Sequence, residues 1–410
     1  METWKLVDSF LDASVDRMVE FQTAMTAIPA ISPDSGGEGE MKKGKALIQY
    51  LEANGLGSVR DYPSDDSRVP GGKRPNLVLK RPGREHDRTI WIMSHLDVVP
   101  EGDREKWTGD PFVVRREGDK LIGRGVEDNQ QGMVCSIFAL KALLENNVGT
   151  KHDIGLVFVS DEEVGSIYGI QHLLTHHADL FGKDDLVLVP DSGDSEGSMI
   201  ETAEKSILWL KVETIGKQCH ASRPYNGKNA FRAASELVFR LEGLAEAFPK
   251  RDELFDPPIS TFEPTKKEAN VPNINTLPGS DVFYLDCRVM PGIPLDDVIA
   301  WIRNRADEVE KKHGVKIALI PDQKEQAAPP TSPDSPIVHA LQDAVRDVYK
   351  VQAKAMGIGG GTVAAYFRRA GLAAAVWSRV DETAHQPDEY CRIPHLIGDA
   401  KVFARLLATL

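Results

Sequence analysis

The chain contains the stretch Thr89-Ile90-Trp91-Ile92-Met93-Ser94-His95-Leu96-Asp97, in which strand-forming residues lead directly into a histidine and an aspartate. Because side chains alternate along a strand, His95 and Asp97 are predicted to point to the same face of the strand end. The carboxyl ends of parallel strands are where α/β sheets bind ligands. One imidazole nitrogen could therefore hold a metal ion while Asp97 orients the ring, although a strand-capping histidine and a turn aspartate would have the same sequence.

Acidic residues also follow two other apolar runs. Asp161-Glu162-Glu163 comes after the run at residues 156–159, and Asp191 comes after residues 186–189. Parallel strands end at one edge of a sheet, so these acids are expected near His95. Adjacent carboxylates repel one another, which is tolerated on a solvated loop or around cations. Acids at three strand ends favour the cation site.

A further acid, Asp128, lies in a glycine-containing segment at residues 123–132, just before a helix predicted over residues 131–144. A helix N-cap would have the same sequence. However, two metal ions about 3.5–4 Å apart need a shared carboxylate, and Asp128 is the best-placed bridge. With His385 in Thr383-Ala384-His385, the set offers two histidines and several carboxylates, which suit zinc, cobalt or manganese. The pattern predicts a metal-dependent amide hydrolase with two divalent ions.

Two domains are expected, because 410 residues exceed what one hydrophobic core usually supports. Strands alternate with helices outside residues 206–326, which predicts an α/β catalytic domain with a mostly parallel sheet over residues 1–205 and 327–410. Residues 206–326 are predicted to form an inserted α+β domain of βαββαβ order. Its elements are a strand at 208–213, a helix at 230–244, strands at 259–262 and 282–288, a helix at 295–313 and a strand at 316–320.

Composition excludes several classes of partner. A net charge of -13 works against binding of nucleic acid or an anionic membrane surface, since both need a basic face. The sequence has neither a spanning apolar stretch nor a secretory leader. Its four cysteines are far apart and predict reduced thiols. We therefore expect a cytoplasmic protein that binds no nucleic acid and no membrane.

Taken in order, these segments resemble the dinuclear zinc metallopeptidase family that contains glutamate carboxypeptidase, acetylornithine deacetylase, succinyl-diaminopimelate desuccinylase and aminoacylase. The resemblance covers nearly the whole chain and implies a zinc-exopeptidase-like catalytic domain. It implies a cis peptide bond between Asp128 and Asn129. The metal ligands that it implies are His95 and Asp191 on one ion, Glu163 and His385 on the other, and Asp128 between them.

The same resemblance implies the roles of the catalytic residues. Glu162 would be the general base that takes a proton to produce a metal-bridging hydroxide, and Asp97 would orient His95. The inserted domain would act as a lid and would form a homodimer. From it, His220 would reach the neighbouring subunit's active site and stabilise the oxyanion. Residues implied in substrate contact or lid structure are Asn270, Asn273, Arg288, Gly360 and Gly361.

Two departures from the family pattern bear on the substrate. Gln130 stands where many relatives carry a lysine, which leaves the metal set intact. Asp191 is typical of the family's peptidases, whereas the acetylornithine and succinyl-diaminopimelate enzymes carry glutamate there. We therefore expect a dipeptidase or carboxypeptidase acting on small peptides. The alternatives are an N-acyl amino acid deacylase, such as a desuccinylase or acetylornithine deacetylase, and an inactive metal-binding module, which would be marked by loss of a ligand or of the base.

Overall fold

The computed structural model describes residues 2–410, which form two compact units. Unit 1 comprises residues 2–202, Thr331–Met356 and Thr362–Leu410. Unit 2 comprises Ala203–Pro330 and Gly357–Gly361. The chain therefore leaves unit 1 after Thr202, returns to it at Thr331, and contributes a second, short segment to unit 2 at Gly357–Gly361.

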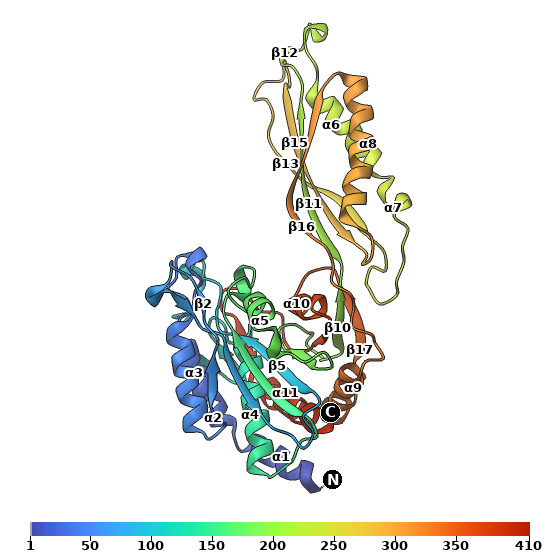
Figure 1. Ribbon diagram of the computed structural model, residues 1–410. Coiled ribbons are helices and arrows are strands. Elements are labelled where there is room, and N and C mark those ends of the chain that lie inside the picture. Colours follow the sequence, from blue (N-terminus) through green and yellow to red (C-terminus); the bar gives the residue numbers. More distant parts are fainter. Residues whose placement is uncertain (1) are drawn as a thin grey trace. The chain divides into compact units, whose positions relative to one another are not determined.

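Unit 1 is organised around an eight-stranded sheet (Figure 1). Its four central strands, β8, β5, β9 and β18, run parallel to one another, whereas β4 pairs antiparallel with β8 and with β1, and β10 pairs antiparallel with β18. The predicted α/β class is confirmed, and the parallel part of the sheet is its centre. In spatial order the strands are β1 (Val59–Asp61), β4 (Leu77–Arg81), β8 (Asp153–Val159), β5 (Thr89–His95), β9 (Leu186–Val189), β18 (Ala373–Val376), β10 (Met199–Glu204) and β17 (Lys354–Ile358).

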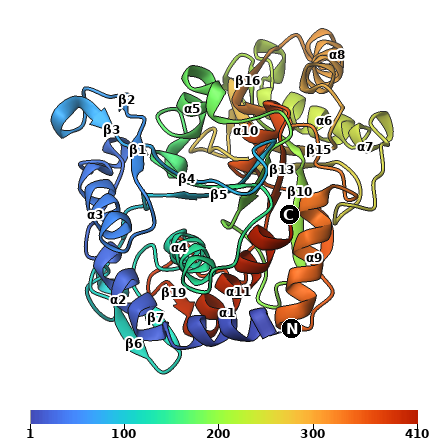
Figure 2. The ribbon, with the colours of Figure 1, turned by 60° about the horizontal axis from the view of Figure 1, so that its bottom comes forward.

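Helices cover both faces of this sheet (Figure 2). Ile90 and Ile92 of β5 pack in one core with the first four helices, α9 and α11, whereas Trp91 and Met93 pack in another core with α5 and α10. A strand that is buried on both faces needs apolar residues at every position, which is why β5 reads as a continuous apolar run. The helices are α1 (Glu2–Asp12), α2 (Val15–Thr26), α3 (Met41–Ala53), α4 (Gln130–Glu145), α5 (Ile170–His176), α9 (Pro336–Tyr349), α10 (Ala364–Arg369) and α11 (Ile393–Thr409).

Unit 2 is a two-layer α+β structure. Its four-stranded sheet is antiparallel throughout, and its elements follow the order βαββαβ along the chain, with the short helix α7 (Leu244–Ala247) added. Alternate residues of β11 face the helices in the buried core, including Leu208 and Leu210, whereas Trp209 between them is 40% exposed. The main elements are β11 (Ser206–Ile215), α6 (Ala230–Leu241), β13 (Thr261–Lys267), β15 (Ser280–Val289), α8 (Leu295–His313) and β16 (Lys316–Glu325).

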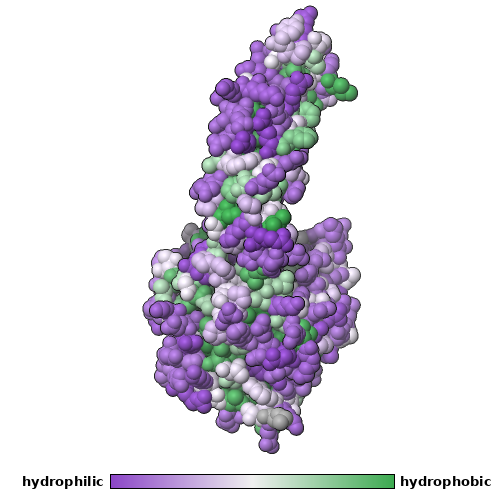
Figure 3. All heavy atoms as spheres, turned by 90° about the vertical axis from the view of Figure 1, so that its right-hand side faces the viewer, coloured by the Kyte–Doolittle hydropathy of each residue, from purple (hydrophilic) through white to green (hydrophobic). Residues whose placement is uncertain are grey.

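Figure 3 shows one face on which hydrophilic residues prevail and hydrophobic residues gather in small groups. Among residues 2–410, every helix is too short or too polar to cross a membrane.

Candidate metal centre

The predicted ligands meet at the carboxyl edge of the parallel strands of unit 1. His95 is the last residue of β5, Glu163 lies in a 3-10 turn (Glu162–Val164) after β8, and Asp191 follows β9. Asp128 lies two residues before the start of α4, and His385 lies in the loop between β18 and β19 (Tyr390–Arg392). Five segments that are far apart in the sequence thus supply one cluster.

Asp128 occupies the middle of this cluster. Its Oδ1 lies 2.9 Å from Nε2 of His95, and its Oδ2 lies 3.1 Å from Nε2 of His385. Asp191 Oδ1 is 3.3 Å from the same nitrogen of His95, and Glu163 Oε2 is 3.0 Å from that of His385. Each histidine therefore faces Asp128 and one further acid: His95 faces Asp191, and His385 faces Glu163. Asp128 is common to the two groups.

The donor set fits divalent cations. Two imidazoles and several partly buried carboxylates carry a net negative charge that an apolar interior tolerates only when it is compensated. Imidazole nitrogen and carboxylate oxygen are the donors that zinc, cobalt and manganese accept in proteins. Ligand atoms of His95, Asp128 and Glu163, and also those of His95, Glu162 and Asp191, lie within 4.8 Å of one another. By reach alone, Glu162 could also serve as a ligand.

The carboxylates set the ionisation of the histidines. Hydrogen bonds that the His385 imidazole donates to the carboxylates of Asp128 and Glu163 raise the pKa of His385 to about 10. Burial opposes the charge on His95, but its contacts with Asp128 and Asp191 outweigh burial and raise its pKa well above the usual value. Metal binding needs neutral imidazole, so protons and cations compete for the same nitrogens.

Asp97 orients more than one group. Its two carboxylate oxygens accept hydrogen bonds from the backbone N–H groups of Glu162 and Glu163, both at 3.1 Å. Nδ1 of His95 lies 3.0 Å from the backbone carbonyl oxygen of Asp97 and 3.5 Å from its carboxylate. The residue thus fixes the turn that carries both glutamates, and it faces His95 mainly through its main chain.

Asp161 turns away from the cluster. It adopts a left-handed conformation with φ of 69°, and its Oδ1 lies 2.7 Å from Nη1 of Arg74. Arg74 also forms a two-point contact with Glu40, and the side chains of Arg74 and Glu40 are fully buried. This ion pairing explains how three adjacent acids can follow β8. Nothing in the local sequence marks Arg74 or Glu40, and the sequence analysis missed both.

Two further acids that the sequence analysis did not single out lie buried beside the predicted ligands. Glu127 accepts hydrogen bonds from the segment before His385, and Glu389 accepts them from the segment before Asp128. Asn129 donates to Asp191 Oδ1 at 2.6 Å. The predicted cis bond between Asp128 and Asn129 is confirmed. Glu127 is adjacent to a predicted ligand, but its partners are more than 250 positions away, so no local signal identifies them.

The other predicted residues lie in unit 2. His220 is exposed, and its Nδ1 lies 2.8 Å from the Ser222 hydroxyl. Asn270 donates to Asp281 at 2.8 Å, while Arg288 donates to Asp286 at 2.7 Å and to the Gly359 carbonyl at 2.8 Å. Their roles toward a substrate stay predictions, as do those of Asn273, Gly360 and Gly361.

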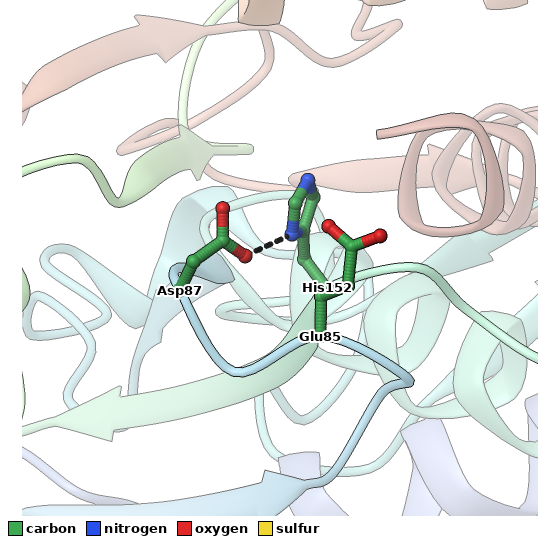
Figure 4. A group of neighbouring side chains, drawn as sticks. All are labelled: Glu85, Asp87 and His152. Carbon is green, nitrogen blue, oxygen red and sulfur yellow. Dashed lines mark hydrogen bonds and ion pairs between the residues drawn. The ribbon is translucent and has the colours of Figure 1, made fainter.

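A second acidic group lies in the loops that precede β5 and β8. His152 Nδ1 is 2.7 Å from Asp87 Oδ1, and Glu85 lies beside them (Figure 4). Both carboxylates are exposed, and each has a cation within reach: Lys151 lies 3.8 Å from Glu85 and Arg88 lies 3.9 Å from Asp87. These ion pairs account for the group without a metal ion.

Comparison with known proteins identifies related chains. The family described as Peptidase family M20/M25/M40 matches residues 91–409. An uncharacterized metallohydrolase of Methanocaldococcus jannaschii is 38% identical over 96% of this chain and 99% of its own length. A succinyl-diaminopimelate desuccinylase of Roseobacter denitrificans is 27% identical over 82% of this chain and 87% of its own length. The crystal structure of aminopeptidase PepT from Bacillus cereus superposes with a TM-score of 0.76 at 17% identity, over 96% and 98%, which is a likeness of fold.

Replacing Arg74 by methionine is expected to lower the free energy of unfolding of the metal-free protein by about 3–5 kcal/mol, because Glu40 and Asp161 would keep buried charges without a partner. Thermal and urea unfolding in the presence of a chelator would measure the change. The matched control is Arg84→Met, since Arg84 is exposed and its guanidinium forms no ion pair with residues 2–410. Equal stability of the two variants would contradict the proposed importance of the buried pairs.

Proposed function

This chain belongs to Peptidase family M20/M25/M40 and is a metallohydrolase, and on that premise we propose that it hydrolyses amide bonds in small peptides at a dinuclear centre. The observation that carries the proposal is the position of Asp128, whose two oxygens each face a different histidine. A carboxylate in that position is what two neighbouring cations require.

We assign His95 and Asp191 to one cation, Glu163 and His385 to the other, and Asp128 to both. The donor types favour zinc, with cobalt or manganese as alternatives. When bound, the cations supply Lewis acidity that polarises the scissile carbonyl and makes a water molecule more acidic.

Glu162 is the proposed general base. Among residues 2–410 its carboxylate has no hydrogen-bond partner, whereas Glu163 contacts His385 and also accepts from the backbone N–H of Val99 at 3.2 Å. Burial raises the pKa of Glu162 well above its usual value, and a higher pKa makes a carboxylate a stronger base. With its backbone held by Asp97, Glu162 is placed to take a proton from the attacking water and return it to the leaving amine.

The substrate class rests on Asp191, because an aspartate at this position is typical of the family's peptidases. The likeness to a succinyl-diaminopimelate desuccinylase supports the alternative of an N-acyl amino acid deacylase. All five proposed ligands and the proposed base are present, which argues against an inactive metal-binding module.

A substrate panel would test the proposed reaction. The protein would be stripped with a chelator and reconstituted separately with zinc, cobalt and manganese. We expect it to release free amine from dipeptides with a higher kcat/KM than from N-acetyl or N-succinyl amino acids. Faster hydrolysis of the N-succinyl compounds would instead favour the deacylase, and no hydrolysis with any metal would contradict both.

The role of Glu162 predicts a separation of metal binding from turnover. Glu162→Gln should retain the metal content of the unmodified protein and lose about 10²–10⁴-fold in kcat, as expected for removal of a general base. Metal analysis together with steady-state kinetics would measure both quantities. Glu163→Gln is the matched variant, and it should lose metal as well as activity. Loss of a metal ion from Glu162→Gln would show that Glu162 is a ligand instead.

We also propose that unit 2 forms a homodimer through α6. The helix exposes two aromatic side chains, with Phe231 46% and Phe239 73% accessible, beside a groove lined also by Val238, Pro264 and Phe283. Exposed apolar groups that adjoin a groove are typical of association surfaces, and twofold dimers are the commonest assemblies of identical chains.

Phe239→Glu is therefore expected to convert a dimer into a monomer in size-exclusion chromatography with light scattering. Ile167→Glu is the control, because Ile167 is 64% exposed in unit 1 and outside the groove. If the unmodified protein is a monomer, the proposed dimer is wrong, and so is the role of His220 in a neighbouring subunit's active site.

A further inference from the structure

We propose that Glu127 is a positioning residue that fixes one of the two metal positions by holding His385 beside Asp128; this inference rests on the proposed dinuclear centre. Glu127 directly precedes Asp128 in the sequence. Its Oε1 accepts a hydrogen bond from the backbone N–H of Asp381 at 2.7 Å. Its Oε2 accepts from the N–H groups of Thr383 at 2.5 Å and Ala384 at 3.0 Å.

The histidines at the two proposed metal positions are held in place by different parts of the structure. The His95 side chain is fully buried at the end of β5, where pairing with β8 on one side and β9 on the other fixes the strand. The His385 side chain is 55% exposed and lies in a loop. Its location therefore depends on the backbone of the residues before it. Glu127 anchors that backbone.

A second glutamate makes the converse contacts, from the loop of His385 to the segment that carries Asp128. Glu389 follows His385 by four residues, and it accepts hydrogen bonds from the N–H groups of Gly125 at 3.0 Å, Glu127 at 3.0 Å and Asp128 at 3.1 Å. Oε2 of Glu389 also accepts a hydrogen bond from Nη1 of Arg124 at 2.6 Å. We call Glu127 and Glu389 together the carboxylate clamp. Both residues are buried, so each charge-assisted hydrogen bond is shielded from water and a lost partner is not replaced.

A glutamine at position 127 cannot reproduce these contacts. Its amide has one acceptor oxygen and one NH₂ group, which is a donor. Whichever way the amide turns, the NH₂ group faces backbone N–H groups on one side, either that of Asp381 or those of Thr383 and Ala384. The loop that carries His385 is thereby released on that side. Partners that orient metal ligands typically contribute 10–100-fold to metal affinity.

The test is titration of zinc into the chelator-stripped full chain, followed by calorimetry and by competition with a chromophoric chelator. The unmodified protein is expected to bind two zinc ions. Glu127→Gln is expected to bind the first with unchanged affinity and the second about 10–100-fold more weakly. Glu145→Gln is the matched control, because Glu145 is exposed at the end of α4, and it should behave as the unmodified protein does.

A second pair of variants keeps the test valid if Glu127→Gln fails to fold by circular dichroism. The Thr383 hydroxyl lies 2.9 Å from Oε2 of Glu127 and 2.8 Å from the carbonyl of Tyr390. Thr383→Val removes this hydroxyl, whereas Thr383→Ser keeps it. Only the valine variant should therefore bind the second zinc ion with lower affinity.

The outcomes separate the two proposals. If the unmodified protein binds fewer than two zinc ions, the dinuclear centre is wrong. If it binds two, and the variants bind both with unchanged affinities or lose both equally, the centre stands and the role of Glu127 is overturned.

Discussion

The site depends on how buried negative charge is compensated at one edge of a sheet. Most acids at this edge have partners inside the protein. Asp97 accepts from two backbone N–H groups, Asp161 pairs with Arg74, and Glu127 and Glu389 accept from the loops that carry the ligands. The acids that remain are Asp128, Glu162, Glu163 and Asp191. Within residues 2–410 this group contacts two histidines, the side-chain amide of Asn129 and the backbone N–H of Val99, and no lysine or arginine. Uncompensated charge at this place is what identifies a cation site, more than the number of acids does.

The sequence allowed prediction of the strand ends because apolar runs that are buried on both faces are unambiguous and acids follow them directly. It did not indicate the direction of the outer strands. The connection between β4 and β5 covers only residues 82–88, which is too short for a parallel crossover, so β4 runs opposite to β5 and pairs antiparallel with β8. The parallel order is therefore limited to the strands that have helical connections.

Prediction of the site was most complete for the residues whose own side chains face the cluster. The supporting residues could not be predicted, because their function lies in contacts with distant backbone groups. Arg74 is the second residue of a two-residue strand, β3 (Lys73–Arg74), and only the fold brings it to Asp161. Glu127 and Glu389 satisfy main-chain donors, which every residue type except proline offers, so side-chain identity at the partner positions carries no signal.

Solvent reaches the proposed centre unevenly. The His95 side chain is fully buried and those of Asp128 and Asp191 are mostly so, whereas more than half of the His385 side chain is accessible. A catalytic metal site must keep one position open for substrate or water. His95 at the end of β5 and Asp191 after β9 are less accessible than His385, so a substrate would approach the proposed centre from the side of His385. The loop that a substrate would pass is thus also the loop that the carboxylate clamp holds. Hydrogen bonds from its backbone to Glu127 keep His385 in place while its side chain stays accessible to solvent.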